Sequence, residues 1–316
     1  MADRLSILIY HRVLPEPDPL QPGLPDAQQF ARHMRALARW FNVLPLEQAV
    51  TKLREGTLPP RAAAITFDDG YADNCDIALP ILNRLGLTAT FFIATGFLDG
   101  GRMWNDSVVE AIRQWPHQTL DRPALGLHRL PLVSVHDKRS AIQAVISSIK
   151  HECPDERLQV ADSLAEESGL GAGSTLMMTS DWVAKLYAAG MGVGAHTHTH
   201  PILRSLALEA ARADIEKNRE TLEEIIQAPV RLFAYPNGKP AEDYTYEHAR
   251  LVRSMGFTAA VSTAWGTAEK ADDPYQLPRF TPWDAPTWRW LLRLGGMRWS
   301  SRRSQALNGD QVAEAP

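Results

Sequence analysis

The chain has 316 residues, of which 45% are hydrophobic, with a formal net charge of -4 and a pI near 6.2. This composition is typical of a soluble globular protein that can bury a large core. The slightly negative charge gives no general attraction to nucleic acid or anionic lipid, so no nucleic acid is expected as a partner. Two isolated cysteines exclude a disulfide framework and a thiolate metal site.

The N-terminal part of the sequence predicts a strand followed by a helix. The apolar residues 5–10 fit a buried strand. This run is shorter than the roughly 7–15 apolar residues of a signal peptide, so we expect a cytoplasmic protein. Phe30 and Met34 recur at helical spacing over 27–41, after Asp26 as the N-cap.

Strands and helices alternate over most of the remaining chain. A strand over 62–67, a helix that ends at Gly86 and a strand-like run over 87–95 form a β-α-β unit. Residues 101–179 break this rhythm with helical pieces and Pro-rich connections, which indicates a helical insertion. Further elements are expected at 191–195, 208–226, 230–236, 242–255, 257–263 and 275–280. This order predicts α/β architecture, either an open doubly wound sheet or a barrel.

Polar side chains follow three of the predicted strands. Asp68 and Asp69 come directly after the strand at 62–67, and a run of three histidines begins at His196, after another strand. Pro236 and Asn237 follow a third. Because the carboxyl ends of the strands form the active edge of α/β folds, we expect these groups to lie at one rim.

The histidine run and the two carboxylates together indicate a metal site. One carboxylate and two imidazoles form a common catalytic zinc set that leaves one position open for water. His196 and His200 converge if the backbone makes a helical turn, whereas on an extended strand His198 would share their face. The residues alone leave both arrangements open.

Three motifs in this order carry a family resemblance: TFDDG at 66–70, His-Thr-x-x-His at 196–200, and FAYPNG at 233–238. They resemble the polysaccharide deacetylase family, which is also called carbohydrate esterase family four or the NodB homology domain. The resemblance covers about residues 5–280 and implies an irregular (β/α) barrel with fewer than eight strands.

The resemblance also implies an activity and a domain plan. The activity is metal-dependent removal of N-acetyl groups from an amino-sugar of a poly- or oligosaccharide or of a glycan precursor. Zn²⁺ is the expected metal, with Ni²⁺ and Co²⁺ as alternatives. We expect one deacetylase barrel over 1–300, with the helical insertion at 101–179 and a flexible C-terminal tail at 301–316.

Individual roles follow from the same resemblance. Asp68 would be the general base, which accepts a proton from a water molecule that the metal activates. Asp69, His196 and His200 would bind the metal. The backbone N–H of Asn237 would stabilise the oxyanion.

Two features of the family pattern are missing from this sequence. Ala234 stands where many members have an Arg that pairs with the catalytic Asp, and the C-terminal Leu-x-His that supplies a general acid is not found. Our hypothesis is that Arg279 orients Asp68 and that His11, at the end of the first strand, is the general acid.

Aromatic and polar residues provide candidates for sugar contact. We expect Tyr71, Trp104, Asp106, Tyr235 and Pro236 to line the substrate site. The C-terminal segment TWRWLLRLGGMRW could lie on a membrane surface, with a terminal helix packed on the barrel as the alternative.

Two other functions stay open on the sequence alone. One is an amidase that acts on a non-sugar amide such as a ureide or a cyclic imide, and the other is a sugar-binding relative that no longer turns over. Retention of both Asp68 and Asp69 favours an enzyme, because binding alone would not need the carboxylate that does not ligate the metal.

Overall fold

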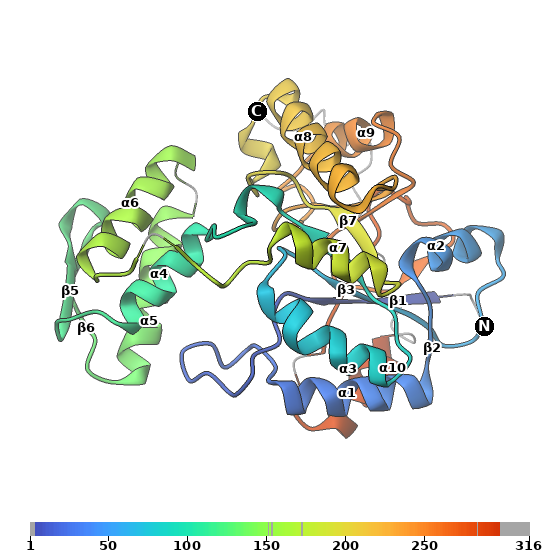
Figure 1. The fold of residues 1–316 in the computed structure, drawn as a ribbon, viewed down its shortest axis with the longest axis horizontal. Helices are drawn as coiled ribbons and strands as arrows, with labels where there is room; N and C mark the ends of the chain where they lie inside the picture. Colours follow the sequence, from blue (N-terminus) through green and yellow to red (C-terminus); the bar gives the residue numbers. More distant parts are fainter. Residues whose placement is uncertain (1–3, 151, 153, 172, 283, 298–316) are drawn as a thin grey trace. The chain divides into compact units, whose positions relative to one another are not determined.

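The computed structural model describes residues 4–150, 152, 154–171, 173–282 and 284–297. The chain divides into two compact units (Figure 1). The predicted tail at 301–316 lies outside the described residues. The first unit consists of Met1–Pro15, Pro25–Asp99 and Met178–Pro316, and the second of Glu16–Leu24 and Gly100–Met177.

A curled sheet forms the centre of the first unit. Seven of its strands follow one another in the order β10-β1-β3-β4-β7-β8-β9, while β2 pairs with β3 outside this path. The pairs are parallel except for β10 against β1. The predicted irregular (β/α) barrel with fewer than eight strands along the path is therefore confirmed. The strands are β1 (Arg4–Tyr10), β2 (Asn42–Val43), β3 (Ala62–Phe67), β4 (Thr90–Ile93), β7 (Gly192–Ala195), β8 (Leu232–Ala234), β9 (Ala259–Val261) and β10 (Ala268–Glu269).

Alternate residues of the strands face two different apolar clusters. In β3, Ala63 and Ile65 pack in the larger cluster with the surrounding helices, whereas Ala62 and Ala64 pack with residues of β4, β8, β9 and β10 and with α2. This alternation is the period-two geometry of a strand. Asp68 directly follows β3 and is separated from Ala62 and Ala64 by an even number of residues, so the alternation places it on the same side of the sheet as those two residues.

The helices of the first unit pack in the larger cluster on the outer face of the sheet, except for α2, which packs in the smaller cluster with Ala62 and Ala64. The N-terminus of α1 is capped by Asp26, whose carboxylate accepts hydrogen bonds from the N–H groups of Gln28 and Gln29. The predicted helix at 208–226 is confirmed by α8. The helices are α1 (Ala27–Trp40), α2 (Leu46–Glu55), α3 (Leu79–Arg84), α7 (Ser180–Ala188), α8 (Leu208–Ile226), α9 (Tyr246–Ser254) and α10 (Thr287–Met297).

An irregular segment fills the space between β9 and β1. The N–H of Leu277 donates to β9, and the N–H of Phe280 donates to β1. A strand was predicted at 275–280, but the structure has only an isolated bridge there, since Pro278 has no N–H with which to continue a ladder. The segment nevertheless carries Arg279 into the barrel.

The C-terminal helix α10 packs on the barrel unit. Trp290 and Leu294 are fully buried, and the ring of Trp290 stacks on that of His33 of α1 at 4.8 Å between centroids. Trp288 and Leu292 are exposed. This is the packed-helix alternative, and the predicted membrane-surface contact is not supported. Among the described residues, no helix combines the length and the apolar character that a membrane span needs.

The second unit has its own core. It contains α4 (Trp104–Arg113), α5 (Val135–Ile149), α6 (Pro154–Glu167) and a hairpin of β5 (Thr119–Arg122) with β6 (Leu127–Pro131). Val108, Ile112 and Val145 are fully buried in its apolar cluster. The helices agree with the helical character expected at 101–179, while the short hairpin was not predicted.

Candidate metal and catalytic site

The ends of neighbouring parallel strands bring the predicted catalytic groups together. Asp68 and Asp69 follow β3, His196 follows β7, and Asn237 stands three residues after β8. His11 follows β1, which lies beside β3 in the sheet. The rim expected from the sequence therefore exists, at the carboxyl ends of the strands.

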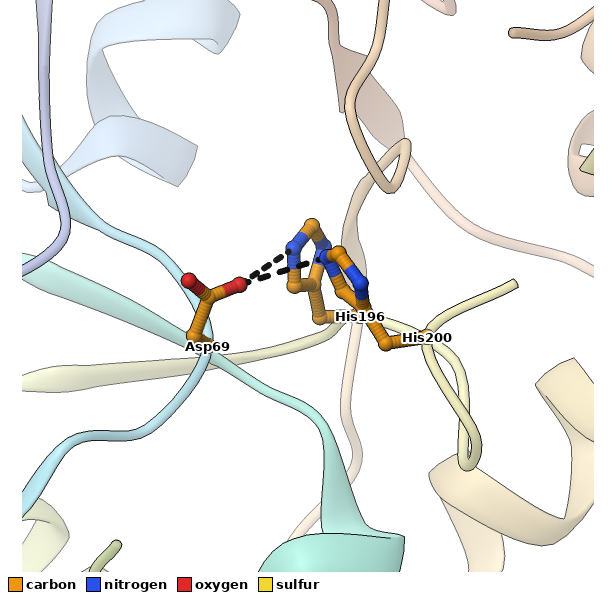
Figure 2. Close-up of side chains that lie close together, drawn as sticks. All are labelled: Asp69, His196 and His200. Carbon is orange, nitrogen blue, oxygen red and sulfur yellow. Dashed lines mark ion pairs between the residues drawn. The ribbon is translucent and has the colours of Figure 1, made fainter. Parts of the chain in front are cut away.

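Asp69, His196 and His200 form a compact group of possible metal ligands (Figure 2). One ligand atom of each residue lies within 4.8 Å of the other two. Both imidazole Nε2 atoms lie 3.3 Å from Oδ1 of Asp69. His198 is outside this group, since its Nδ1 lies 2.9 Å from the hydroxyl of Thr95.

The hydrogen-bonding state of this group fits a cation. The Nδ1 of His196 lies 2.8 Å from the carbonyl oxygen of Ala234, which can only accept, so Nδ1 carries the proton. In the neutral ring, Nε2 then presents a lone pair to Asp69. Oδ1 of Asp69 is buried without a hydrogen-bond donor. Converging acceptors of this kind need a positive charge between them, and a carboxylate with two imidazoles suits Zn²⁺.

The carboxylate of Asp69 is ionised in this setting. Burial by itself would raise the pKa of Asp69, but protons on the two Nε2 atoms that face it would outweigh burial and hold the pKa well below the ordinary range, and a cation bound between the three side chains would take the place of those protons. An ionised, buried carboxylate is a strong ligand for a metal ion.

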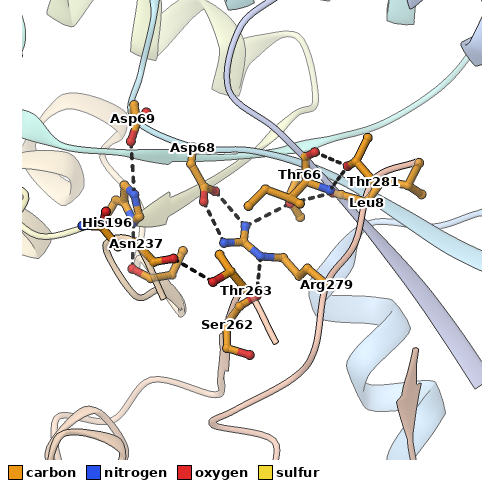
Figure 3. A network of polar contacts seen from close by, with 12 residues as sticks. Leu8, Thr66, Asp68, Asp69, His196, Asn237, Ser262, Thr263, Arg279 and Thr281 are labelled. Carbon is orange, nitrogen blue, oxygen red and sulfur yellow. Dashed lines mark hydrogen bonds and ion pairs between the residues drawn. The ribbon is translucent and has the colours of Figure 1, made fainter. Parts of the chain in front are cut away.

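Asp68 is paired with Arg279, which comes from the segment that closes the barrel (Figure 3). Nη1 and Nη2 of Arg279 each donate to one carboxylate oxygen of Asp68, both at 2.7 Å. Nη1 also donates to the hydroxyl of Thr66 at 3.1 Å, and Nε donates to the carbonyl of Ser262 at 3.0 Å. Both side chains of the pair are buried. The geometry is the bidentate fork that fixes a carboxylate most firmly.

This pair keeps Asp68 ionised. Burial raises the pKa of Asp68, but the positive charge of Arg279, followed by smaller contributions from His196 and His11 when their rings are protonated, lowers it more, and the net shift is downward. Asp68 is therefore a charged carboxylate that can accept a proton. Because His11 contributes to the shift, its side chain lies within electrostatic range of Asp68.

The loops that carry these groups adopt strained backbone conformations. Four non-glycine residues of the site have positive φ: Asp69 (78°), Thr197 (64°), His200 (51°) and Asn237 (57°). This region is unfavourable for most residues, and above all for the β-branched Thr197. Strained backbone conformations of this kind are concentrated at functional sites, where contacts with the surrounding structure maintain them.

The Pro236–Gly238 loop is positioned to present a backbone donor. The hydroxyl of Thr263 donates to the carbonyl of Asn237 at 2.7 Å, and the N–H of Thr263 donates to the carbonyl of Gly238. A Cβ at Gly238, whose φ is +73°, would lie 2.9 Å from the carbonyl oxygen of Tyr235. Among the described residues, the N–H of Asn237 meets no acceptor.

Several predicted substrate contacts lie in other surroundings. Tyr71 is 3% exposed, and the guanidinium of Arg12 covers its ring at 4.8 Å. Tyr235 is buried in the core, where its hydroxyl donates to the carbonyl of Tyr275. Both aromatic rings are thus occupied by protein contacts, which the sequence pattern could not show.

The other predicted contacts are divided between the two units. Pro236 is buried in the loop that carries Asn237. Trp104 and Asp106 lie in the second unit, at the start of α4, where the guanidinium of Arg157 lies 5.0 Å from the centre of the Trp104 ring. Their roles toward a substrate stay predictions.

An irregular barrel with these groups at its strand ends defines the class of NodB-like barrels. The chain belongs to the polysaccharide deacetylase family: the family's sequence profile, described as polysaccharide deacetylase, matches residues 55–121 and 160–260. A polysaccharide deacetylase is a hydrolase that acts on an acetylated carbohydrate.

Individual relatives agree with this assignment. A Bacillus subtilis protein named "Putative polysaccharide deacetylase YxkH" is 33% identical over 92 residues, which are 28% of this chain and only about a third (32%) of that protein's length. Two solved structures share the fold. The Streptococcus pyogenes deacetylase PplD in complex with acetate has a TM-score of 0.60 at 17% identity, covering 89% of this chain and 92% of that one. IcaB from Ammonifex degensii has a TM-score of 0.59 at 20% identity, covering 92% and 97%.

Proposed function

We propose that this protein is a metal-dependent N-deacetylase of an amino-sugar in a glycan or a glycan precursor. The observation that carries the proposal is the group of Asp69, His196 and His200 beside a second carboxylate, Asp68, which a buried arginine holds ionised. A site for sugar binding alone would gain nothing from burying this additional charge.

The metal would be held by Asp69, His196 and His200. A divalent cation at this position lowers the pKa of water and polarises a carbonyl group. Zn²⁺ suits the ligand set best, and Ni²⁺ and Co²⁺ accept the same ligands.

The chain's own residues supply the proton transfers. Asp68, fixed by Arg279, accepts the proton of the water molecule that attacks the carbonyl carbon of the acetamide. The N–H of Asn237 donates to the oxyanion that develops on the carbonyl oxygen. The C–N bond then breaks, and a proton passes to the leaving nitrogen, which yields acetate and a free amine.

His11 is the proposed donor of that last proton. It stands at the end of β1, is exposed, and lies within electrostatic range of Asp68 and Asp69. Its backbone carbonyl accepts a hydrogen bond from the buried side chain of Asn74 at 2.9 Å. This bond fixes the point from which the imidazole projects.

A cytoplasmic location would favour a glycan precursor over a finished polymer as the substrate.

The direct test is acetate release from a panel of N-acetylated amino-sugar conjugates, with enzyme that has been stripped by a chelator and given back Zn²⁺, Ni²⁺ or Co²⁺. We expect metal-restored release that is lost in Asp68→Asn and kept in Asp76→Asn, an exposed carboxylate of the same region. If the enzyme hydrolyses only a ureide or a cyclic imide, the substrate is a non-sugar amide instead of an amino-sugar. If it hydrolyses none of the amides, a binding role is favoured.

A further inference from the structure

The loop that carries His196 and His200 is supported from behind by helix α8. Asp214 and Asn218 stand four residues apart on α8 and therefore share one face of the helix. Asn218 has no exposed surface, and it occupies a position between the buried Ile215 and Leu222, where an apolar residue would be expected. A fully buried amide in an apolar stripe calls for an explanation in its contacts.

Asn218 connects the ends of two neighbouring strands of the sheet. Its Oδ1 accepts the N–H of His196 at 3.0 Å, just after β7. Its Nδ2 donates to the carbonyl of Ile93 at 2.9 Å and to the hydroxyl of Thr95 at 3.0 Å, both at the end of β4. The amide thus fixes the backbone of one candidate metal ligand relative to the strand beside it.

Asp214 holds the middle of the same loop. Its carboxylate accepts the N–H of His198 at 2.6 Å, together with the N–H and the hydroxyl of Thr199 at 3.2 and 2.6 Å. Thr197, which lies between these contacts, is in the left-handed region, and its hydroxyl accepts the N–H of His200 at 3.1 Å. The two α8 side chains therefore bond to the loop on both sides of Thr197.

We propose that Asp214 and Asn218 are positioning residues that preform the metal-binding loop, so that the affinity for the metal depends on helix α8. The inference rests on the proposed function and deepens it. Neither side chain belongs to the ligand group of Asp69, His196 and His200, and both act through the backbone of the loop. Partners of this kind, one shell away from the ligands, typically change metal affinity by about 10- to 100-fold when they are removed.

The test compares wild type with Asn218→Leu and Asp214→Ala. The affinity for Zn²⁺ is measured by competition with a chromophoric chelator, and the ligand geometry by the visible absorption spectrum of the Co²⁺-loaded protein. Asn83→Leu on the exposed side of α3 and Glu216→Ala on the exposed side of α8 are the matched controls. Thermal melting of the metal-free proteins reports whether each variant is folded.

We expect Zn²⁺ binding to weaken by about 10- to 100-fold in Asn218→Leu and by at least about fivefold in Asp214→Ala, with an altered Co²⁺ spectrum and unchanged controls. Wild-type affinity and spectrum in a folded Asn218→Leu would overturn the positioning role. If that variant does not fold, wild-type binding by Asp214→Ala, which is only half-buried, would overturn it instead. A wild-type protein that binds no Zn²⁺ would overturn the metal site itself and this inference with it.

Discussion

Removal of Arg279 should be among the most destabilising single changes in the barrel. The guanidinium makes two hydrogen bonds of 2.7 Å to Asp68 and two more to Thr66 and Ser262, and it is fully buried. Removing one partner of a buried ion pair leaves a buried charge without compensation, which costs about 3–5 kcal/mol. We therefore expect Arg279→Leu to lower the free energy of unfolding at pH 7 by about this amount.

Urea unfolding of the metal-free protein measures this loss, with two controls. Arg212→Leu removes a partly exposed arginine whose nearest carboxylate, that of Glu209, is 3.8 Å away, and it should cost less than about 1 kcal/mol. The double variant Asp68→Asn/Arg279→Leu should be more stable than the sum of the single effects predicts, since it leaves no buried charge. Additive effects, or a loss under about 1 kcal/mol in Arg279→Leu, would refute the role given to this pair.

The contribution of Asp68 to the free energy of unfolding should depend on pH with opposite signs in wild type and in Arg279→Leu. In wild type the pKa of Asp68 is below that of the unfolded chain, so the stabilisation is present above the unfolded pKa and is lost as the pH falls. Without Arg279, burial dominates and raises the pKa of Asp68. As the pH falls, this buried carboxylate takes up a proton and becomes neutral, so it should destabilise Arg279→Leu less at low pH. Parallel pH profiles for the two proteins would contradict this reasoning.

Three further predictions follow from other contacts of the barrel unit. His11→Ala should lower kcat by about 10²- to 10⁴-fold with unchanged metal content, and wild-type turnover would remove His11 from the proton transfer. Thr263→Val should lower kcat by roughly fivefold at nearly constant melting temperature, because it removes only the hydroxyl bond to Asn237; a change confined to KM would argue against an oxyanion role. Burial lowers the pKa of His33, with its contact to Ala285 partly opposing this, so stability should fall as the pH drops below about 6.5, where the unfolded chain binds the proton more readily than the folded chain. His33→Phe should flatten that decline in urea unfolding measured from pH 7.5 to 5, and an unchanged slope would rule out this histidine.

Much of the candidate site could be predicted from the sequence, because the sequence motifs that carry its residues stand at the ends of predicted strands. Asp68 and Asp69 follow a largely apolar strand that is buried along its whole length, and such a strand in an α/β fold ends at the active edge. The convergence of His196 with His200 could not be derived in this way. It depends on positive φ at Thr197, a conformation that intrinsic preferences disfavour and that tertiary contacts impose.

The contribution of Arg279 illustrates a second limit. Arg279 lies 211 residues after Asp68, and the segment that carries it is not a regular strand. No periodicity could fix where its side chain points. The sequence supported it only as a hypothesis, and the bidentate pairing became evident from the three-dimensional structure.

Asn218 was missed, although the sequence holds a signal for it. A single polar residue interrupts the apolar stripe of α8 between Ile215 and Leu222. A polar residue that interrupts an apolar stripe can be a buried anchor, and it should be considered as one when a candidate ligand loop directly precedes the helix. Tyr71 and Tyr235 are buried and packed against protein groups, as aromatic residues beside a motif often are, and their roles toward a substrate stay predictions.

The central claim is that Asp69, His196 and His200 hold a metal ion that the reaction requires. The most direct measurement is the Zn²⁺ content of chelator-stripped protein after equilibrium dialysis, taken together with acetate release from N-acetylated amino-sugars. We predict one ion per chain in wild type and in His198→Gln, whose ring lies outside the ligand group, and loss of both ion and acetate release in His200→Gln. Full metal content in His200→Gln, or acetate release from wild type that a chelator leaves unchanged, would contradict the account.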